Sequence, residues 1–187
     1  MDRKGNDKLS ELAVILDELA HVPDPLASKE VSELIRLIRN AKRIYLSGAG
    51  RSGLMIRAFA NRLMQLGFTI SVVGEISEPH TQPGDLLIIN SASGCSMQLL
   101  AQAKVAVSNG VKVVIITTDV HSPLAKVADT VIKIAAQSKV SQTTSLQPMG
   151  SLFEQMSLLL FDAISLKLMK ITGIDETSMR KNHADIE

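Results

Sequence analysis

The stretch Arg43-Ile-Tyr-Leu-Ser-Gly-Ala-Gly-Arg-Ser-Gly53 decides the fold of this 187-residue chain. Residues 44–46 form a short apolar run, a Ser/Gly-rich turn follows, and apolar residues then recur at helical spacing as far as Gly67. An apolar run that passes through a tight turn into an amphipathic helix is typical of the strand–helix unit of an α/β protein. The sequence therefore predicts a strand near residues 44–46 and a helix directly after the turn.

The same alternation continues along the chain. Further strands are predicted at residues 68–73, 86–89, 113–117 and 130–134, and helices at residues 97–108 and 123–127. Strands that alternate with helices pair in parallel through right-handed crossovers. We therefore expect an α/β fold with a doubly wound, five-stranded parallel sheet.

Helical patterns also flank the predicted sheet. The first predicted helix carries apolar residues at helical spacing, namely Leu9, Leu12, Ile15, Leu16 and Leu19. After the break at residues 21–25, Ser28 resembles the N-cap of a second helix. These two helices could cover the sheet or pack on another subunit. A long helix is predicted at residues 150–171, followed by a polar segment too short to fold alone.

The expected organisation is a single domain spanning residues 1–187. It comprises an N-terminal helical segment at 1–40, an α/β core at 41–172 and a tail at 173–187.

Composition excludes several function classes. The formal net charge of +1 argues against nucleic acid or an acidic membrane as the main partner. Cys95, the single cysteine, excludes an internal disulfide and a cysteine-based zinc site, and agrees with a reducing compartment. The charged N-terminus lacks the apolar segment of a secretion signal, and no apolar stretch is long enough to span a bilayer. We expect a soluble, cytoplasmic protein.

Two predicted strands end in loops rich in Ser and Gly. Ligands of open α/β sheets bind beyond the carboxyl ends of the strands, where helix N–H groups attract anions. Small residues let a ligand approach the backbone, and hydroxyls can donate to phosphate oxygens. The residues expected to bind phosphate are Ser47, Gly48, Gly50, Ser52, Ser91, Ser93, Gly94 and Ser96. Either loop alone is better explained as a tight strand–helix turn with serine caps, but the occurrence of both, after the first and third strands, predicts a phosphate cradle.

Nucleotide motifs are weak in this chain. The spacing Gly48-x-Gly50-x-x-Gly53 matches a dinucleotide fingerprint, but the expected acidic residue does not directly follow the next strand core. A Walker loop would need Gly-Lys followed by Ser or Thr, and the sequence has none. We expect no cofactor and no metal.

The two loops, Ser47-Gly-Ala-Gly-Arg-Ser52 and Ser91-Ala-Ser-Gly-Cys-Ser96, resemble the phosphosugar loops of sugar isomerase (SIS) domains. Three further stretches narrow the resemblance to the 6-phospho-3-hexuloisomerases. These are Val73-Gly-Glu75 with Pro79, Gln147-Pro-Met-Gly-Ser-Leu-Phe-Glu154, and residues 179–187. Together they cover nearly the whole chain.

The resemblance implies a flavodoxin-like fold and a definite activity. Members of this family interconvert a 3-keto hexose 6-phosphate, arabino-3-hexulose 6-phosphate, and fructose 6-phosphate through an enediol. Such a reaction serves formaldehyde fixation in the ribulose monophosphate pathway, or pentose phosphate supply. The resemblance also implies a homo-oligomer, a dimer or a tetramer.

Four charged or titratable residues are candidates for the site, two of them by this resemblance. Glu154 becomes the candidate base, although a Glu in a first helical turn also favours the helix dipole by itself. His183 becomes a second catalytic candidate that could serve a neighbouring subunit, with a solvated tail histidine as the alternative. Arg51 is a candidate to neutralise the phosphate or contact a substrate hydroxyl, with a solvated cation at the helix start as the alternative. Glu75, which follows the second strand, is a candidate to contact sugar hydroxyls.

The second loop departs from the family pattern, because Cys95 stands where Glu is usual and Ala92 replaces a Gly. Two alternatives therefore stay open. One is an isomerase for another phosphosugar, such as arabinose 5-phosphate or a heptulose phosphate. The other is a sugar-phosphate sensor without catalysis.

Overall fold

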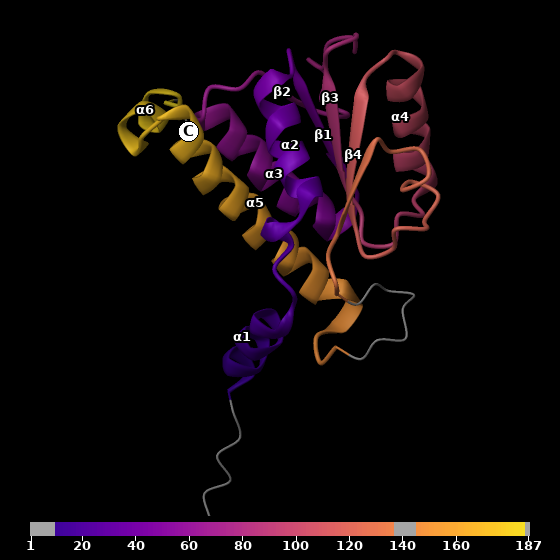
Figure 1. Ribbon diagram of the computed structural model, residues 1–187, viewed down its shortest axis with the longest axis vertical. Coiled ribbons are helices and arrows are strands. Elements are labelled where there is room, and N and C mark those ends of the chain that lie inside the picture. Colours follow the sequence, from indigo (N-terminus) through magenta and orange to yellow (C-terminus); the bar gives the residue numbers. More distant parts are fainter. Residues whose placement is uncertain (1–9, 137–144, 186–187) are drawn as a thin grey trace, which may run out of the picture.

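The sheet is built as the sequence predicts. The computed structural model describes residues 10–136 and 145–185. Its five strands are β1 Ile44–Gly48, β2 Ile70–Val72, β3 Leu86–Asn90, β4 Lys112–Thr117 and β5 Thr130–Lys133. All pair in parallel in the order β2-β1-β3-β4-β5, which confirms the doubly wound α/β fold of flavodoxin-like order (Figure 1).

The helices cover the sheet on two faces. They are α1 Glu11–His21, α2 Lys29–Asn40, α3 Gly50–Gln65, α4 Met97–Ser108, α5 Ser151–Thr172 and α6 Glu176–Lys181. Helices α2, α3 and α5 lie on one face and α4 on the other, while α1 extends away from the sheet (Figure 1). The two N-terminal helices and the long C-terminal helix are confirmed. Among the residues described, no helix is long and apolar enough to cross a membrane.

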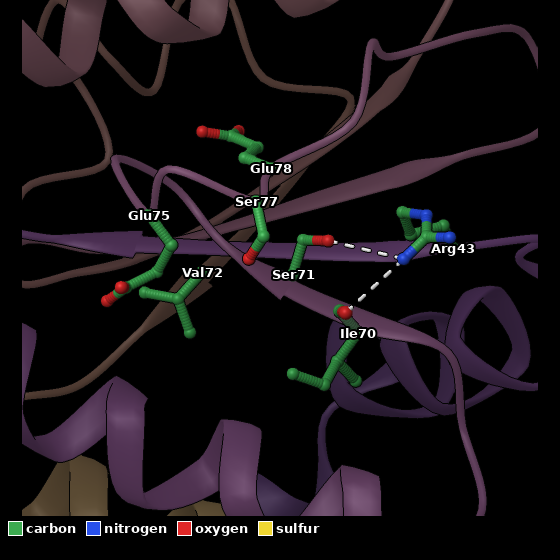
Figure 2. Close-up of a pocket in the computed structure, with 7 residues that line it drawn as sticks. All are labelled: Arg43, Ile70, Ser71, Val72, Glu75, Ser77 and Glu78. Carbon is green, nitrogen blue, oxygen red and sulfur yellow. Dashed lines mark hydrogen bonds between the residues drawn. The ribbon is translucent and has the colours of Figure 1, made fainter.

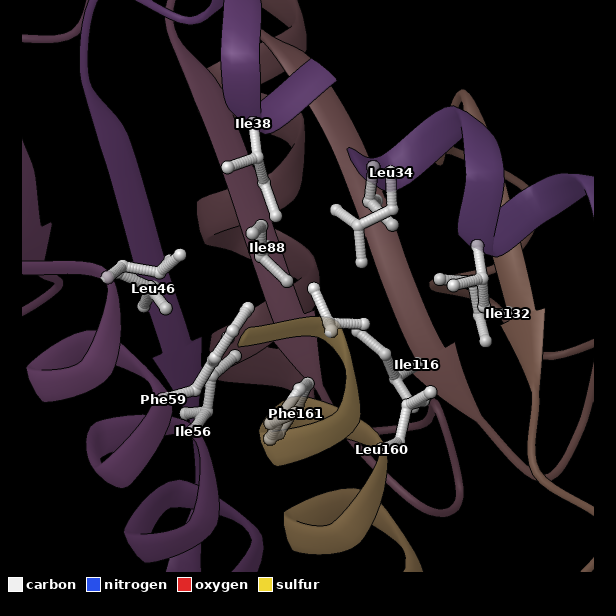
Figure 3. Packing of buried hydrophobic residues seen from close by; sticks show 14 of the residues in the cluster. Leu34, Ile38, Leu46, Ile56, Phe59, Ile88, Ile116, Ile132, Leu160 and Phe161 are labelled. Atoms are coloured by element: carbon white, nitrogen blue, oxygen red, sulfur yellow. The ribbon is translucent and has the colours of Figure 1, made fainter. Parts of the chain in front are cut away.

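Strand alternation divides the core into two layers. On β1, Ile44 and Leu46 pack with α2, α3 and α5, whereas Tyr45 faces the layer that contains α4. Figure 3 shows the larger layer, where Ile88 and Ile116 of the central strands meet residues of α2, α3 and α5. The ring of Phe59 on α3 stacks on that of Phe161 on α5, with centroids 4.6 Å apart. A sheet buried on both faces explains why the strands are apolar runs.

Local predictions hold at several helix ends. The Ser28 hydroxyl accepts a hydrogen bond from Val31 N at 3.1 Å, which confirms it as the N-cap of α2. Helix α4 has the predicted bounds and ends at Asn109-Gly110. Leu9, counted in the first apolar stripe, lies outside the described residues.

The predicted helix at residues 123–127 is wrong. This segment forms successive turns, in which Leu124 N donates to Gly94 O at 3.0 Å. Within the segment, Lys126 N donates to Ser122 O and Val127 N to Leu124 O, so the backbone forms single turns that do not continue into a helix. Strand β2 is also shorter than predicted, because Phe68 N donates back to Leu63 O and so belongs to the end of α3.

The C-terminal segment is more ordered than its polar composition suggests. It forms the short helix α6, which is capped by the Asp175 side chain through Ser178 N. The side-chain amide of Asn182 donates to Gln65 O at the end of α3, at 3.0 Å. The tail does not fold alone, since it packs against α3. A short 3-10 helix, Pro25–Ala27, was also not predicted.

The start of α3 touches β1 through two glycines. A Cβ on Gly53 would lie 2.7 Å from the carbonyl oxygen of Gly48, and a Cβ on Gly48 would lie 3.0 Å from Gly53 Cα. Both contacts are with backbone atoms, which cannot rotate away. The glycine spacing therefore lets α3 begin immediately at the end of β1.

We expect Gly53→Ala to lower the free energy of unfolding by about 1–3 kcal/mol, because the added methyl group overpacks a backbone contact. The matched control is Leu54→Ala at the next residue, whose side chain is exposed; its effect should stay within about 1 kcal/mol. Urea denaturation followed by circular dichroism measures both. Equal stability of the two variants would contradict the close packing of α3 on β1.

Candidate functional site

The two serine-rich loops begin side by side. Parallel pairing of β1 with β3 aligns Gly48 with Asn90, the last residues of the two strands. The chain continues from β1 to β2 on one side and then returns to β3 on the other side of β1. This reversal is the topological switch point at which open α/β sheets bind ligands. Both loops therefore lie at the same edge of the sheet, as the phosphate cradle requires.

The first loop leads directly into α3. Ala49 occupies the N-cap position without a side-chain hydrogen bond, and Gly50 follows with a φ of +58°. Ser52 is buried in the first turn. Backbone N–H groups of an uncapped helix start suit an anion.

Ser47 has a partner of its own. Its side chain is buried, and its hydroxyl donates to Gln102 Oε1 on α4 at 2.5 Å. The hydroxyl has a single proton, so it is directed toward α4 in this structure. The sequence offered no indication of this contact, since the two residues are 55 positions apart.

The second loop is held by a glycine and by backbone contacts. Gly94 has a φ of +62°, and a Cβ there would lie 2.1 Å from Ser122 Oγ. The carbonyl oxygen of Ala92 accepts hydrogen bonds from Thr117 Oγ1 and Thr118 Oγ1, each at 2.9 Å. The loop is thereby fixed to the end of β4.

The serines of this loop also serve as turn and cap residues. Ser93 Oγ accepts from Cys95 N at 3.3 Å, and Ser96 Oγ accepts from Leu99 N at 3.4 Å as the N-cap of α4. A hydroxyl that accepts a backbone hydrogen bond still has its proton to donate. Ser93 and Ser96 are both half-buried and can offer that proton to a ligand, whereas Ser91 is buried at the end of β3.

Glu154 of α5 forms an ion pair with Arg51 of α3. The carboxylate lies in the first turn of α5, and its Oε2 is 3.0 Å from Nη1 of Arg51 in the first turn of α3. The Glu154 side chain is 8% exposed and that of Arg51 is 49% exposed. The same Nη1 donates to Ser151 Oγ at 2.8 Å. An ion pair therefore joins the candidate base to the first serine-rich loop.

Asn90 is a residue that sequence reasoning missed. It is fully buried and donates from Nδ2 to Ser52 O at 3.0 Å. Its Oδ1 lies 3.2 Å from Ser157 Oγ, whose one proton is shared with Phe153 O at 2.8 Å. It therefore connects β3 with α3 and with α5. A polar residue that ends an otherwise apolar strand was the available signal, because buried amides require partners.

Glu75 lies in a pocket at the edge strand β2. The pocket has a volume of about 410 Å³ and is lined by Arg43, Ile70, Ser71, Val72, Glu75, Ser77 and Glu78 (Figure 2). Arg43 donates to Ile70 O and to Ser71 Oγ, at 3.4 and 3.3 Å. Glu75 itself pairs with Arg57 of α3 at 2.6 Å and is half-exposed. None of the serine-loop residues lines this pocket.

His183 lies far from Glu154 within one chain. Glu154 is at the start of α5, and His183 follows α6, beyond the other end of that 22-residue helix. A helix of this length spans about 30 Å. His183 is exposed, and its Nδ1 lies 2.8 Å from Ala184 O. The structure therefore brings Arg51, Glu154 and the serine loops together, but not His183.

Much of the chain matches a known protein family. A family model described as the SIS domain matches residues 37–161, which include all five strands, both serine loops and Glu154.

The chain belongs to the SIS domain family.

Within this family, the chain is similar over nearly its full length to proteins named 3-hexulose-6-phosphate isomerase. The chain is 41% identical to a 3-hexulose-6-phosphate isomerase of Bacillus subtilis, with 94% of this chain and 97% of the relative covered. It is 35% identical to the enzyme of that name from Mycobacterium gastri, with 98% and 93% covered. The resemblance to hexulose phosphate isomerases is thereby confirmed.

A solved SIS structure agrees with the fold. A protein of Methanococcus jannaschii, whose crystal structure infers a function of 3-hexulose-6-phosphate isomerase, superposes with a TM-score of 0.82. Its sequence is 30% identical, and the match covers 96% of this chain and all of that one.

We expect Asn90→Ala to destabilise the protein by about 2–4 kcal/mol, because it leaves a small cavity and removes the hydrogen bond to Ser52 O, while Ser157 Oγ keeps its bond to Phe153 O. Ser93→Ala in the same loop, at a half-buried serine, is the control and should cost less than about 1 kcal/mol. Chemical denaturation distinguishes the two. A neutral Asn90→Ala would show that the three elements are held together by other contacts.

Proposed function

We propose that this protein is a phosphosugar isomerase that interconverts arabino-3-hexulose 6-phosphate and fructose 6-phosphate through an enediol. The observation that carries the proposal is the Arg51–Glu154 pair, which places a mostly buried carboxylate beside the paired serine loops. The relatives named 3-hexulose-6-phosphate isomerase support the choice of substrate.

The serine loops bind the phosphate in this proposal. The phosphate dianion would accept hydrogen bonds from the N-terminal amides of α3 and from the hydroxyls of Ser93 and Ser96. Arg51 supplies a positive charge at the same edge of the sheet. Binding at this end leaves the reactive carbons of the sugar to extend toward the start of α5. Glu75, farther out at β2, is proposed to contact sugar hydroxyls.

The chemistry needs one base and a route for a hydroxyl proton. Glu154 removes the proton from C2 of the 3-keto sugar, which gives an enediolate across C2 and C3. The same carboxylic acid then returns the proton to C3. The hydroxyl proton passes from O2 to O3, so the carbonyl moves to C2 and the atoms balance without an external oxidant or reductant. No cofactor or metal is required by this stoichiometry.

Assembly completes the site in this proposal. His183 is exposed and distant from its own Glu154, so it would serve as the proton shuttle of a neighbouring subunit's site in a homodimer or homotetramer. Exposed leucines on α1 and α5, namely Leu12, Leu16, Leu159 and Leu166, support burial between subunits. We propose a cytoplasmic location and no partnership with nucleic acid or membranes.

Cys95 favours a second candidate, an isomerase for another phosphosugar. Its side chain is exposed in the second loop, and Sγ lies 3.2 Å from Ser93 O. A loop residue next to the proposed phosphate site can alter which sugar fits. Turnover of arabino-3-hexulose 6-phosphate, arabinose 5-phosphate and a heptulose phosphate, compared by NMR, separates the two candidates.

We expect Glu154→Gln to lower kcat by about 10²–10⁴-fold, because the amide cannot accept the C2 proton. Glu176→Gln is the control, since Glu176 is an exposed carboxylate on α6 that pairs with Arg180. Formation of fructose 6-phosphate measures both variants. Full activity of Glu154→Gln would remove Glu154 from the mechanism.

Subunit mixing tests His183. Glu154→Gln and His183→Ala homo-oligomers should each be strongly impaired, because each lacks one group in every site. The two variants are mixed in equal amounts, denatured and refolded together. If His183 serves a neighbouring subunit, about a quarter of the resulting sites should contain both Glu154 from one subunit and His183 from the other. Activity that does not exceed that of the separate variants would show that His183 acts within its own chain or not at all.

A further inference from the structure

Glu18 of α1 accepts hydrogen bonds from three consecutive residues far along the chain. Its Oε1 accepts from Leu146 N at 2.8 Å, and its Oε2 accepts from Ser145 Oγ at 3.1 Å and from Gln147 Nε2 at 3.0 Å. These bonds span 127 to 129 positions of sequence. One carboxylate therefore fixes a whole segment to the N-terminal helix.

The carboxylate form of Glu18 suits this arrangement. All three groups donate, and an ionised carboxylate accepts at both oxygens without offering a proton of its own. Burial acts to raise the pKa of Glu18, but hydrogen bonds from Leu146, Gln147 and Ser145 outweigh it and hold the pKa below its ordinary value. Bonds to a charged acceptor are stronger than neutral ones.

The fixed segment continues into a strained turn. Met149 has a φ of +60° and Gly150 a φ of +84°, so two successive residues take the left-handed conformation. Met149 is the only non-glycine residue with a positive φ in the described part of the chain. Such a residue persists only where its surroundings hold it.

The turn is held at both ends. On one side Gln147 is buried and bound to Glu18, and on the other Ser151 Oγ donates to Pro148 O at 2.8 Å. Ser151 also accepts from Arg51, and Glu154 follows one helical turn later. The position of the candidate base therefore depends on where this turn places the first residues of α5.

We propose that Glu18 is a positioning residue of the isomerase site, which fixes residues 145–147 to α1 and thereby sets the position of Glu154 against Arg51. This inference rests on the proposed function. Glu18 does not reach the reacting atoms, and it acts through the turn and the start of α5.

The test compares Glu18→Gln with Asp17→Asn. The glutamine keeps the shape of Glu18 but turns one acceptor oxygen into an NH₂ group that faces donors. Asp17→Asn removes the same charge from the adjacent residue of α1. Among the described residues, the side chain of Asp17 forms an ion pair with His21 alone. Two quantities are measured for each variant, namely amide hydrogen exchange in residues 145–152 and the separate values of kcat and KM.

We expect Glu18→Gln to speed exchange in residues 145–152 about tenfold or more. Its kcat should fall about ten- to a hundredfold, because a displaced base loses its alignment, while KM changes less than about threefold since the serine loops are untouched. Asp17→Asn should change neither quantity. This pattern supports the proposal, because general unfolding would speed exchange throughout the chain.

Two results would overturn the inference. Unchanged exchange in Glu18→Gln would show that the carboxylate does not hold the segment. Faster exchange with an unchanged kcat would show that the segment does not position the base. If the wild-type protein turns over no phosphosugar, the proposed function fails on that observation alone, while the exchange measurement still decides whether Glu18 anchors the segment.

Discussion

The register between β1 and β3 is the constraint on which the site depends. Pairing Gly48 with Asn90 brings two loops to one edge of the sheet although they are separated by a crossover, a helix and the edge strand β2. The close approach of Gly53 to Gly48 then allows α3 to begin at the end of its strand. Uncapped amides and Arg51 consequently lie next to the second loop, which is the arrangement that the proposed phosphate site requires.

Polar contacts hold α5, which carries the candidate base, to this edge. Asn90 and Ser157 connect β3 with α5, and Arg51 connects α3 with Glu154 and Ser151. The stacked rings of Phe59 and Phe161 pack the same two helices. Breaking the Arg51–Glu154 pair would remove the cation from a mostly buried carboxylate, which is costly, so the arrangement resists distortion. In the proposed mechanism, these contacts would align the groups of the site before the substrate binds, which is the basis of electrostatic preorganisation.

Two peripheral helices, α1 and α6, contact the core in different ways. Helix α1 has no fully buried residue, yet Glu18 binds the segment that leads into α5. Helix α6 packs on α3 through Asn182 and carries the chain to His183 at the opposite end of α5. An isolated subunit therefore separates its two catalytic candidates, and assembly with a second subunit is the proposed way to complete the site.

Much of this protein could be predicted from its sequence, because periodicity and local chemistry act over a few residues. Apolar runs and helical stripes predicted the five strands and the main helices, Ser28 predicted a cap, and parallel pairing predicted that loops after two strands would lie at one edge. The predicted helix at 123–127 is a series of turns fixed to the loop after β3 by the bond from Leu124 N to Gly94 O, a contact that the local pattern does not reveal, and α6 was missed because packing on α3 stabilises a polar segment. The partners of Ser47, Asn90 and Glu18 depended on tertiary structure alone, since a hydrogen bond between residues 38 to 129 positions apart leaves no periodic trace in the sequence. Residue types thus determined what could bind and react, whereas the tertiary structure decided which groups meet.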